Sequence, residues 1–450
     1  MSGGTRLFGT DGVRGVAGEW PLDAPTIARI GAAIVRAHPL GRPTRLVIGR
    51  DTRESGEWIA RELARGAAGE GAVLTSIGVA PTPAVAYLAG ALDFDLGVVL
   101  SASHNPYADN GIKVFSGRGE KFGEEAERDV EAVIADAGWS ASDRPAEPTS
   151  NEALVDAYLE HVARLLPAPG GLSGARIAVD MANGATVATA RRVLERLGFH
   201  VVAMGDGPDG RNINLECGST HPARLAALVV AEGCRLGLAF DGDGDRVILV
   251  DASGRIVDGD AMMLILALAE QRAGRLAGDT VVATVMSNIG LEIALRKYGI
   301  RLLRAPVGDK YVMDAMVQGG YVIGGEQSGH VILASHLPTG DGLATALAVL
   351  AVMADTGREL DDLARELVTY PQTLVNVRVR ERTPVASVPA IQHVITGVES
   401  KLDGRGRVLI RYSGTEPLLR IMIEGEDQTA VQTWANEIAD AAKKALGEAS

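Results

Sequence analysis

Residues 96–106 read Leu-Gly-Val-Val-Leu-Ser-Ala-Ser-His-Asn-Pro, an apolar run followed at once by a polar turn. A continuous apolar run of this length is typical of a strand buried on both faces of a parallel or mixed sheet. Sheets of that kind bind ligands at the carboxyl ends of their strands. The turn that begins at Ser101 is therefore expected where an α/β fold places its functional residues.

The alternation of short apolar runs and longer amphipathic stretches continues on both sides of this segment. Residues 44–49 and 73–77 are predicted as strands, and residues 57–68 and 124–137 as helices. Residues 140–149 are rich in Pro, Ser and acidic residues, which is typical of a linker. The pattern begins again after this linker.

Beyond the linker, strand and helix signals alternate until about residue 369 and then change. The predicted strands are 176–180, 200–204, 236–240, 281–285, 301–304 and 321–323, and a helix is predicted at 185–197. The last part combines strands at 375–379, 407–412 and 418–424 with helices at 388–401 and 429–445, an α+β pattern. We therefore expect three similar α/β domains, each a mixed sheet sandwiched by helices, and a smaller C-terminal α+β domain. Their expected limits are 1–150, 151–256, 257–369 and 370–450.

Composition excludes several classes of protein. Lys and Arg number 44 against 57 Asp and Glu, a net charge of −13, which argues against a nucleic-acid partner. Two cysteines cannot form a secreted disulfide framework. The longest apolar run, residues 261–269, is shorter than a membrane span, and no secretory leader is visible. We expect a cytoplasmic protein with no membrane partner.

The polar turn at residues 101–106 offers a candidate nucleophile. Asn105-Pro106 favours a turn that presents the residues before it, among them the hydroxyl of Ser103 and the imidazole of His104. The same composition is also typical of an ordinary polar turn, so this segment alone does not decide the chemistry.

Residues 241–246, Asp-Gly-Asp-Gly-Asp-Arg, follow another predicted strand. Alternate side chains of an extended loop point the same way, so Asp241, Asp243 and Asp245 can converge on one cation. Unpaired, three such carboxylates would repel one another, and hard oxygen ligands suit Mg²⁺. An EF-hand is excluded because Arg246 replaces the required glycine and Ala252 the required glutamate.

Further polar loops could bind a sugar phosphate. Residues 325–330, Gly-Glu-Gln-Ser-Gly-His, offer groups for sugar hydroxyls or an amine. In residues 411–420, two arginines bracket a Ser-Gly-Thr turn, a common arrangement for phosphate. Residues 8–15 and 307–311 add charged, Gly-containing turns. Each of these loops taken alone is also typical of a surface turn.

Taken in this order, the motifs resemble those of the α-D-phosphohexomutase superfamily over essentially the whole chain. The bacterial phosphoglucosamine mutase branch is the most similar, on residues 9–15, 101–106 and 339–342, on Gln327, and on Asp309, where phosphomannomutase/phosphoglucomutase relatives usually have His. The resemblance implies four domains around a central cleft. It implies interconversion of glucosamine 6-phosphate and glucosamine 1-phosphate, in UDP-N-acetylglucosamine biosynthesis, with a phosphomannomutase/phosphoglucomutase as the alternative.

The resemblance also implies roles for individual residues. Ser103 would carry a phosphate and would hold Mg²⁺ together with Asp241, Asp243 and Asp245. Catalytic acid–base or charge roles would belong to Arg14, His104, Lys113, Arg246 and His330. The substrate would be bound by the sugar-loop residues Glu326, Gln327 and Ser328, by Asp309, and by the phosphate-loop residues Arg411, Ser413, Gly414, Thr415, Glu416 and Arg420.

The resemblance implies partners as well. Glucosamine or glucose 1,6-bisphosphate would be the activator and intermediate, the substrate would be a phosphorylated hexosamine, and a homodimer is common in this branch. Two other classes stay open at this point. A phosphatase using Asp241 as nucleophile would leave Ser103 without a role, and a sugar-phosphate sensor would not need an intact nucleophile.

Overall fold

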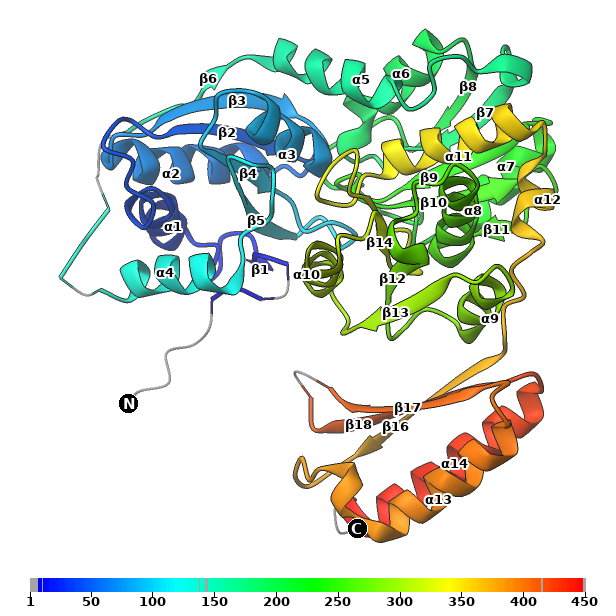
Figure 1. Cartoon of the computed structure of the whole chain (residues 1–450). Helices are drawn as coiled ribbons and strands as arrows, with labels where there is room; N and C mark the ends of the chain where they lie inside the picture. The colour runs from blue at the N-terminus through cyan, green and yellow to red at the C-terminus, as the bar shows by residue number, and fades with distance from the viewer. Residues whose placement is uncertain (1–6, 10, 137, 142–144, 414–415, 448–450) are drawn as a thin grey trace. The chain divides into compact units, whose positions relative to one another are not determined.

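The computed structural model describes residues 7–9, 11–136, 138–141, 145–413 and 416–447 (Figure 1). Contacts divide the chain into two compact units. The first unit contains residues 1–284 and 303–365, and the second contains residues 285–302 and 366–450. Each unit is described by itself.

The first sheet has six strands in the order β1-β5-β4-β2-β3-β6. β2 pairs in parallel with β3 and β4, whereas β5 pairs antiparallel with β4 and β1, so the sheet is mixed. All of Leu96–Leu100 is buried, as the apolar run predicts. The strands are β1 (Val13–Val16), β2 (Arg45–Arg50), β3 (Val73–Val79), β4 (Leu96–Leu100), β5 (Asp109–Ser116) and β6 (Thr149–Ser150).

Two glycines allow the helices of this domain to pack closely. A Cβ on Gly31 would lie 2.2 Å from the carbonyl oxygen of Leu63, and one on Gly66 would lie 1.7 Å from that of Ala28. Only a residue without a side chain permits backbones to approach so closely. The helices are α1 (Ala24–Arg36), α2 (Gly56–Gly69), α3 (Thr82–Ala91) and α4 (Glu124–Ala135).

After α5 (Val155–Ala163) comes a five-stranded sheet in the order β11-β10-β9-β7-β8. Its strands are β7 (Arg176–Asp180), β8 (His200–Met204), β9 (Leu236–Phe240), β10 (Val247–Asp251) and β11 (Ile256–Val257), with helices α6 (Ala190–Arg196) and α7 (Ala223–Ala231). The helix predicted at 185–197 is broken. Residues Ala185–Ala188 form a 3₁₀ turn, because the amide of Ala185 donates to the carbonyl of Gly242 (2.8 Å) and holds this turn against the acidic loop.

A third, four-stranded sheet has the order β13-β12-β14-β15. The apolar run at residues 261–269 lies in α8, which is buried through most of its length. No helix among the described residues is both long and apolar enough to cross a membrane. The elements are β12 (Thr280–Thr284), β13 (Arg301–Ala305), β14 (Ile323–Gly325), β15 (Val331–Leu333), α8 (Gly259–Arg272), α10 (Asp309–Gly319), α11 (Gly342–Thr356) and α12 (Leu360–Ala364).

The second unit contains an antiparallel sheet in the order β16-β18-β17, with α13 and α14 covering one face (Figure 1). α9 (Ile289–Lys297) belongs to this unit, because the buried carboxylate of Glu424 accepts a hydrogen bond from the amide of Ile289 (3.1 Å). The other elements are β16 (Gln372–Arg378), β17 (Arg407–Tyr412), β18 (Leu418–Glu424), α13 (Pro389–Leu402) and α14 (Gln428–Leu446). Each of the three larger sheets contains parallel strand pairs and is accompanied by helices, and the fourth sheet belongs to a smaller α+β domain. This arrangement confirms the predicted fold class.

Candidate active site

Ser103 lies three residues beyond Leu100, the last residue of β4, in a turn with a positive φ of 52°. This left-handed conformation turns the buried side chain toward the acidic loop that follows β9. The Ser103 hydroxyl donates a hydrogen bond to Asp241 Oδ2 (2.5 Å). His104 Nδ1 is 3.4 Å from the same hydroxyl. The hydroxyl predicted as nucleophile and the loop predicted as cation site are therefore in direct contact.

The three aspartates of the acidic loop converge as predicted. One carboxylate oxygen from each of Asp241, Asp243 and Asp245 lies within 4.8 Å of the others, and all three side chains are buried. Among the described residues, Asp243 Oδ1 has no hydrogen-bond partner. Burial, followed by the charges of Asp245 and Asp243, raises the pKa of Asp241 well above its usual value. Buried hard oxygens that repel one another fit a hard divalent cation such as Mg²⁺.

Lys113, on β5, supplies the nearest positive charge. Its Nζ lies 2.8 Å from Asp243 Oδ2, 3.3 Å from Asp245 Oδ2 and 3.1 Å from Asp11 Oδ2. Burial alone would lower the pKa of Lys113, but these carboxylates outweigh burial and hold its pKa well above the usual value. Lys113 is therefore cationic at neutral pH, which suits charge neutralisation rather than proton abstraction.

Two arginines flank the Ser103 turn. Arg14 forms an ion pair with Asp11 and lies 3.4 Å from the carbonyl oxygen of Ala102. The backbone amide of Arg246 donates to Asp241 Oδ1 (3.1 Å), and its Nε is 3.7 Å from Asp245 Oδ1. Burial together with the charges of Arg246 and Arg14 lowers the pKa of His104, so its neutral form is favoured.

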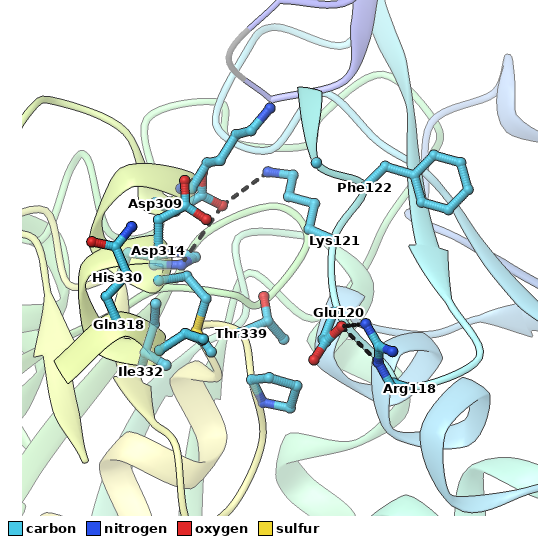
Figure 2. A pocket seen from close by; sticks show the side chains of 15 residues that line it. Arg118, Glu120, Lys121, Phe122, Asp309, Asp314, Gln318, His330, Ile332 and Thr339 are labelled. Atoms are coloured by element: carbon cyan, nitrogen blue, oxygen red, sulfur yellow. Dashed lines mark hydrogen bonds and ion pairs between the residues drawn. The ribbon is translucent and has the colours of Figure 1, made fainter. Parts of the chain in front are cut away.

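His330 connects the acidic loop to the third domain. Its buried imidazole places Nδ1 3.5 Å from Asp245 Oδ1 and Nε2 3.9 Å from Asp309 Oδ2. Burial opposes protonation of His330, but Asp245 and Asp309 outweigh it and raise the pKa above the usual value. Figure 2 shows His330 and Asp309 facing a cavity of about 420 Å³, across which Lys121 reaches Asp309. The structure thus brings both predicted residues to one wall of a cavity.

The expected sugar loop, residues 325–330, is a tight turn. Glu326 Oε1 accepts from the amide of Gly308 (3.2 Å), and Ser328 Oγ donates to Glu326 Oε2 (3.3 Å). The Gln327 side chain instead donates to Asp258 Oδ2 (3.1 Å), at the start of α8. A Cβ on Gly329, whose φ is 92°, would lie 2.1 Å from the carbonyl oxygen of Val247, so the loop packs against β10.

The expected phosphate loop lies in the second unit. Arg411 and Arg420 face each other across β17 and β18, and burial together with Arg420 lowers the pKa of Arg411. Arg420 Nη2 donates to Ser413 Oγ (3.3 Å) and to Glu416 Oε2 (3.2 Å). Gly414 and Thr415 lie outside the described residues. Two neighbouring guanidinium groups beside a hydroxyl suit an anionic ligand.

Two charged residues of this site escape sequence reasoning. Asp11 contacts Arg14, Lys113 and Lys121, and Lys121 donates to both Asp11 and Asp309. Asp11 belongs to the Gly-rich turn at residues 8–15, so the signal for it was present but ambiguous. No local sequence pattern indicates a role for Lys121, because it is a single lysine in a charged turn.

Comparisons with known proteins place this site in a family. Models of the phosphoglucomutase/phosphomannomutase α/β/α domains I, II and III and of the C-terminal domain match residues 5–140, 156–254, 258–370 and 374–441. The phosphoglucosamine mutase of Solibacter usitatus is 46% identical over 448 residues, covering 98% of this chain and 99% of that protein. That of Desulforudis audaxviator is 47% identical and covers 96% of each chain.

A solved structure agrees with these matches. The putative phosphomannomutase of Thermus thermophilus superposes with a TM-score of 0.79 at 25% identity, over 98% of this chain and 99% of the other. Each of the four predicted domains is therefore matched by one of the four domain models, and the solved structure superposes on nearly the whole chain. The chain belongs to the phosphoglucomutase/phosphomannomutase family, the α-D-phosphohexomutases.

Proposed function

We propose that the protein interconverts glucosamine 6-phosphate and glucosamine 1-phosphate, with Ser103 as the residue that carries the transferred phosphate. One observation carries this proposal: the Ser103 hydroxyl contacts Asp241 within the cluster of three carboxylates. Relatives named phosphoglucosamine mutase, at 45–47% identity over at least 95% of the chain, support glucosamine phosphate as the substrate.

Asp241, Asp243 and Asp245 would hold Mg²⁺, together with an oxygen of phosphorylated Ser103. When bound, the cation would neutralise negative charge on the phosphoryl group. Phosphoryl transfer depends mainly on positioning and on charge stabilisation. Lys113, Arg14 and Arg246 supply permanent positive charge beside the Ser103 hydroxyl. His104, whose Nδ1 is 3.4 Å from the Ser103 hydroxyl, and His330, whose Nδ1 is 3.5 Å from Asp245 Oδ1, would accept or donate protons in the reaction.

The proposed reaction has two transfers. The Ser103 phosphate passes to the free 1-hydroxyl of glucosamine 6-phosphate, and the displaced serine oxygen takes the proton of that hydroxyl. This gives glucosamine 1,6-bisphosphate, which then returns its 6-phosphate to Ser103 and leaves glucosamine 1-phosphate. In each transfer one P–O bond forms and one breaks, so glucosamine or glucose 1,6-bisphosphate can prime an unphosphorylated enzyme.

The remaining predicted residues would bind the substrate. Glu326, Gln327, Ser328 and Asp309 would orient the sugar, and the phosphate loop would hold the phosphate that is not reacting. We retain the domain limits 1–150, 151–256, 257–369 and 370–450, the homodimer and the cytoplasmic location as predictions. Gly414, Thr415 and Glu416 belong to the phosphate loop in this proposal.

The decisive experiment is a substrate panel. The purified protein, with Mg²⁺ and a trace of glucose 1,6-bisphosphate, is offered glucosamine, glucose and mannose 6-phosphates, and each 1-phosphate is followed by phosphorus NMR. We expect glucosamine 6-phosphate to turn over fastest. Comparable turnover of the neutral hexoses would favour the phosphomannomutase/phosphoglucomutase alternative and would show that Gln327 and Asp309 are poor guides to substrate.

The role of Ser103 is tested in the same assay. Ser103→Ala should abolish turnover, whereas Ser400→Ala, on the exposed face of α13, should leave it unchanged. Both variants should unfold at the temperature of the parent protein to within a few degrees. Near-normal turnover by Ser103→Ala would exclude the phosphoserine mechanism.

A further inference from the structure

Residues Arg50-Asp51-Thr52-Arg53 begin at the last residue of β2 and have no part in the proposed reaction. The side chains of Asp51 and Arg53 are nevertheless fully buried. Arg53 Nε donates to Asp51 Oδ2 (2.8 Å), which also accepts a hydrogen bond from Ser101 Oγ (2.6 Å). Burying a charged pair costs free energy unless the remaining donors of the pair also form hydrogen bonds. The other hydrogen-bond partners of Arg53 therefore show what this buried pair holds.

All of those partners are main-chain carbonyls of the nucleophile turn, defined here as residues 103–109. The Arg53 guanidinium donates to the carbonyl oxygens of Ser103 (3.1 Å), Asn105 (2.8 Å) and Asp109 (2.9 Å), and also to that of Pro106. A guanidinium group carries five N–H donors in a rigid planar fork, and no other side chain can reach so many acceptors at once.

A second donor comes from the neighbouring domain. Asn214, in the buried part of the loop between β8 and α7, donates from Nδ2 to the carbonyls of Ser103 (2.8 Å) and Asn105 (3.1 Å). These are two of the carbonyls that Arg53 holds. The acidic loop also packs closely against the Ser103 carbonyl. A Cβ added to Gly242 would lie 2.4 Å from that oxygen.

We infer that Arg53 and Asn214 are positioning residues that hold the nucleophile turn in its left-handed conformation and set Ser103 against the acidic loop. Arg53 anchors the turn to its own domain, and Asn214 anchors it to the domain that carries the aspartates. Ser103 has a positive φ, which is unfavourable for a residue with a side chain and persists only where surrounding contacts enforce it. This inference rests on the proposed role of Ser103.

The test variant is Asn214→Asp. Aspartate has the same size and tolerates the φ of 59° at this position, but it replaces the amide donor by a carboxylate facing two carbonyl oxygens. The matched control is Asn212→Asp in the same loop, because the side-chain amide of Asn212 donates to the Gly207 carbonyl (3.0 Å), within that loop. Each protein is charged with ³²P from labelled glucose 1,6-bisphosphate and mixed with glucosamine 6-phosphate in a single-turnover experiment.

We expect the rate constant for transfer of label from Ser103 to fall about 10²-fold in Asn214→Asp, the effect of a displacement of about 1 Å at a reacting group. The KM for glucosamine 6-phosphate should change less than about threefold, since the Asn214 amide donates to main-chain carbonyls of the nucleophile turn. Asn212→Asp should match the parent protein. A purely structural role would lower the amplitude of the transfer, through a smaller folded fraction, and leave the rate constant unchanged.

An unchanged rate constant in Asn214→Asp would overturn the inference. Should that variant fail to fold, Asn214→Gly fits the same backbone conformation without the amide, and we expect it to slow transfer less than Asn214→Asp would, because Arg53 still holds both carbonyls. A parent-like rate constant in Asn214→Gly would also overturn the inference. If the parent protein itself takes up no label on Ser103, the proposed function fails instead, so the two failures are distinguishable.

Discussion

Lys121 Nζ lies 2.8 Å from Asp309 Oδ2, so that a residue just beyond β5 pairs with the first residue of α10. The same ammonium group also contacts Asp11. Burial alone would raise the pKa of Asp309, but the charge and hydrogen bond of Lys121 together with the charge of His330 outweigh burial and hold the pKa of Asp309 below its usual value. One lysine therefore compensates two carboxylates that would otherwise repel each other in a mostly buried site.

Replacing this lysine should destabilise the protein. Lys121→Met leaves Asp11 and Asp309 without their shared cation, which should lower the free energy of unfolding at pH 7 by about 3 kcal/mol, as urea unfolding would show. Lys401→Met is the control, because Lys401 pairs with Glu437 on the surface (3.3 Å), where such a pair contributes less than about 1 kcal/mol. Equal losses in the two variants would show that the Lys121 pairs contribute no more than a surface pair.

The stability that comes from this pair depends on pH in a defined direction. A carboxylate whose folded-state pKa lies below its unfolded value stabilises the fold above the unfolded pKa, and this contribution is lost as the pH falls through the folded pKa. The difference in unfolding free energy between the parent protein and Lys121→Met should therefore be full at pH 7 and shrink below about pH 4. Unfolding at pH 7, 5 and 3.5 measures it. A difference that stays constant over this range would contradict the assignment.

Gly242→Ala should damage the site through a steric clash. The added Cβ would lie 2.4 Å from the Ser103 carbonyl oxygen and 2.9 Å from Asn214 Nδ2, so the nucleophile turn must shift away from the acidic loop. A shift of about 1 Å should lower kcat about 10²-fold. Gly207→Ala in the same domain adds a Cβ that meets, among the described residues, no atom within 4 Å beyond its own chain neighbours, and it should keep parent activity. Equal kcat values for the two variants would show that the turn tolerates displacement.

Binding of a divalent cation should stabilise the folded protein. A ligand at one hundred times its Kd adds about 2.7 kcal/mol to the unfolding free energy, and the acidic loop is the predicted site. We expect Mg²⁺ to raise the unfolding temperature of the parent protein and of Asp206→Asn, whose aspartate forms a surface pair with Arg191. Asp243→Asn should lose most of this shift. A full Mg²⁺ shift in Asp243→Asn would place the cation elsewhere.

The two cysteines should be unreactive in the folded protein. Cys217 and Cys234 are both buried and free. Burial, followed by the charge of Asp180, raises the pKa of Cys217 to about 11, so at pH 8 only about one molecule in a thousand carries the reactive thiolate. A disulfide reagent such as Ellman's should release two equivalents of dye only after unfolding in guanidinium chloride. Reaction should accelerate as the pH rises toward 11, and rapid native reaction at pH 8 would contradict the buried placement.

Some of the site was predictable because it depends on short-range patterns. Five consecutive apolar residues give a buried strand at Leu96–Leu100, and the polar turn after it must lie at the sheet edge. The alternate spacing of Asp241, Asp243 and Asp245 in one loop predicts that their carboxylates converge, and they lie within 4.8 Å of one another. The order of the motifs indicated the family and the four-domain fold, and both are confirmed.

The sequence by itself therefore determined the strands, the acidic loop, the candidate nucleophile and the family. Tertiary structure decided which side chains hold them in place. Lys121 and Asp309 are 188 residues apart, and Asn214 and Ser103 are 111 apart. The role of Arg53 became visible only from the carbonyls around it. Such contacts are set by how domains pack, because a hydrogen bond depends on distances of a few tenths of an ångström that no local pattern specifies.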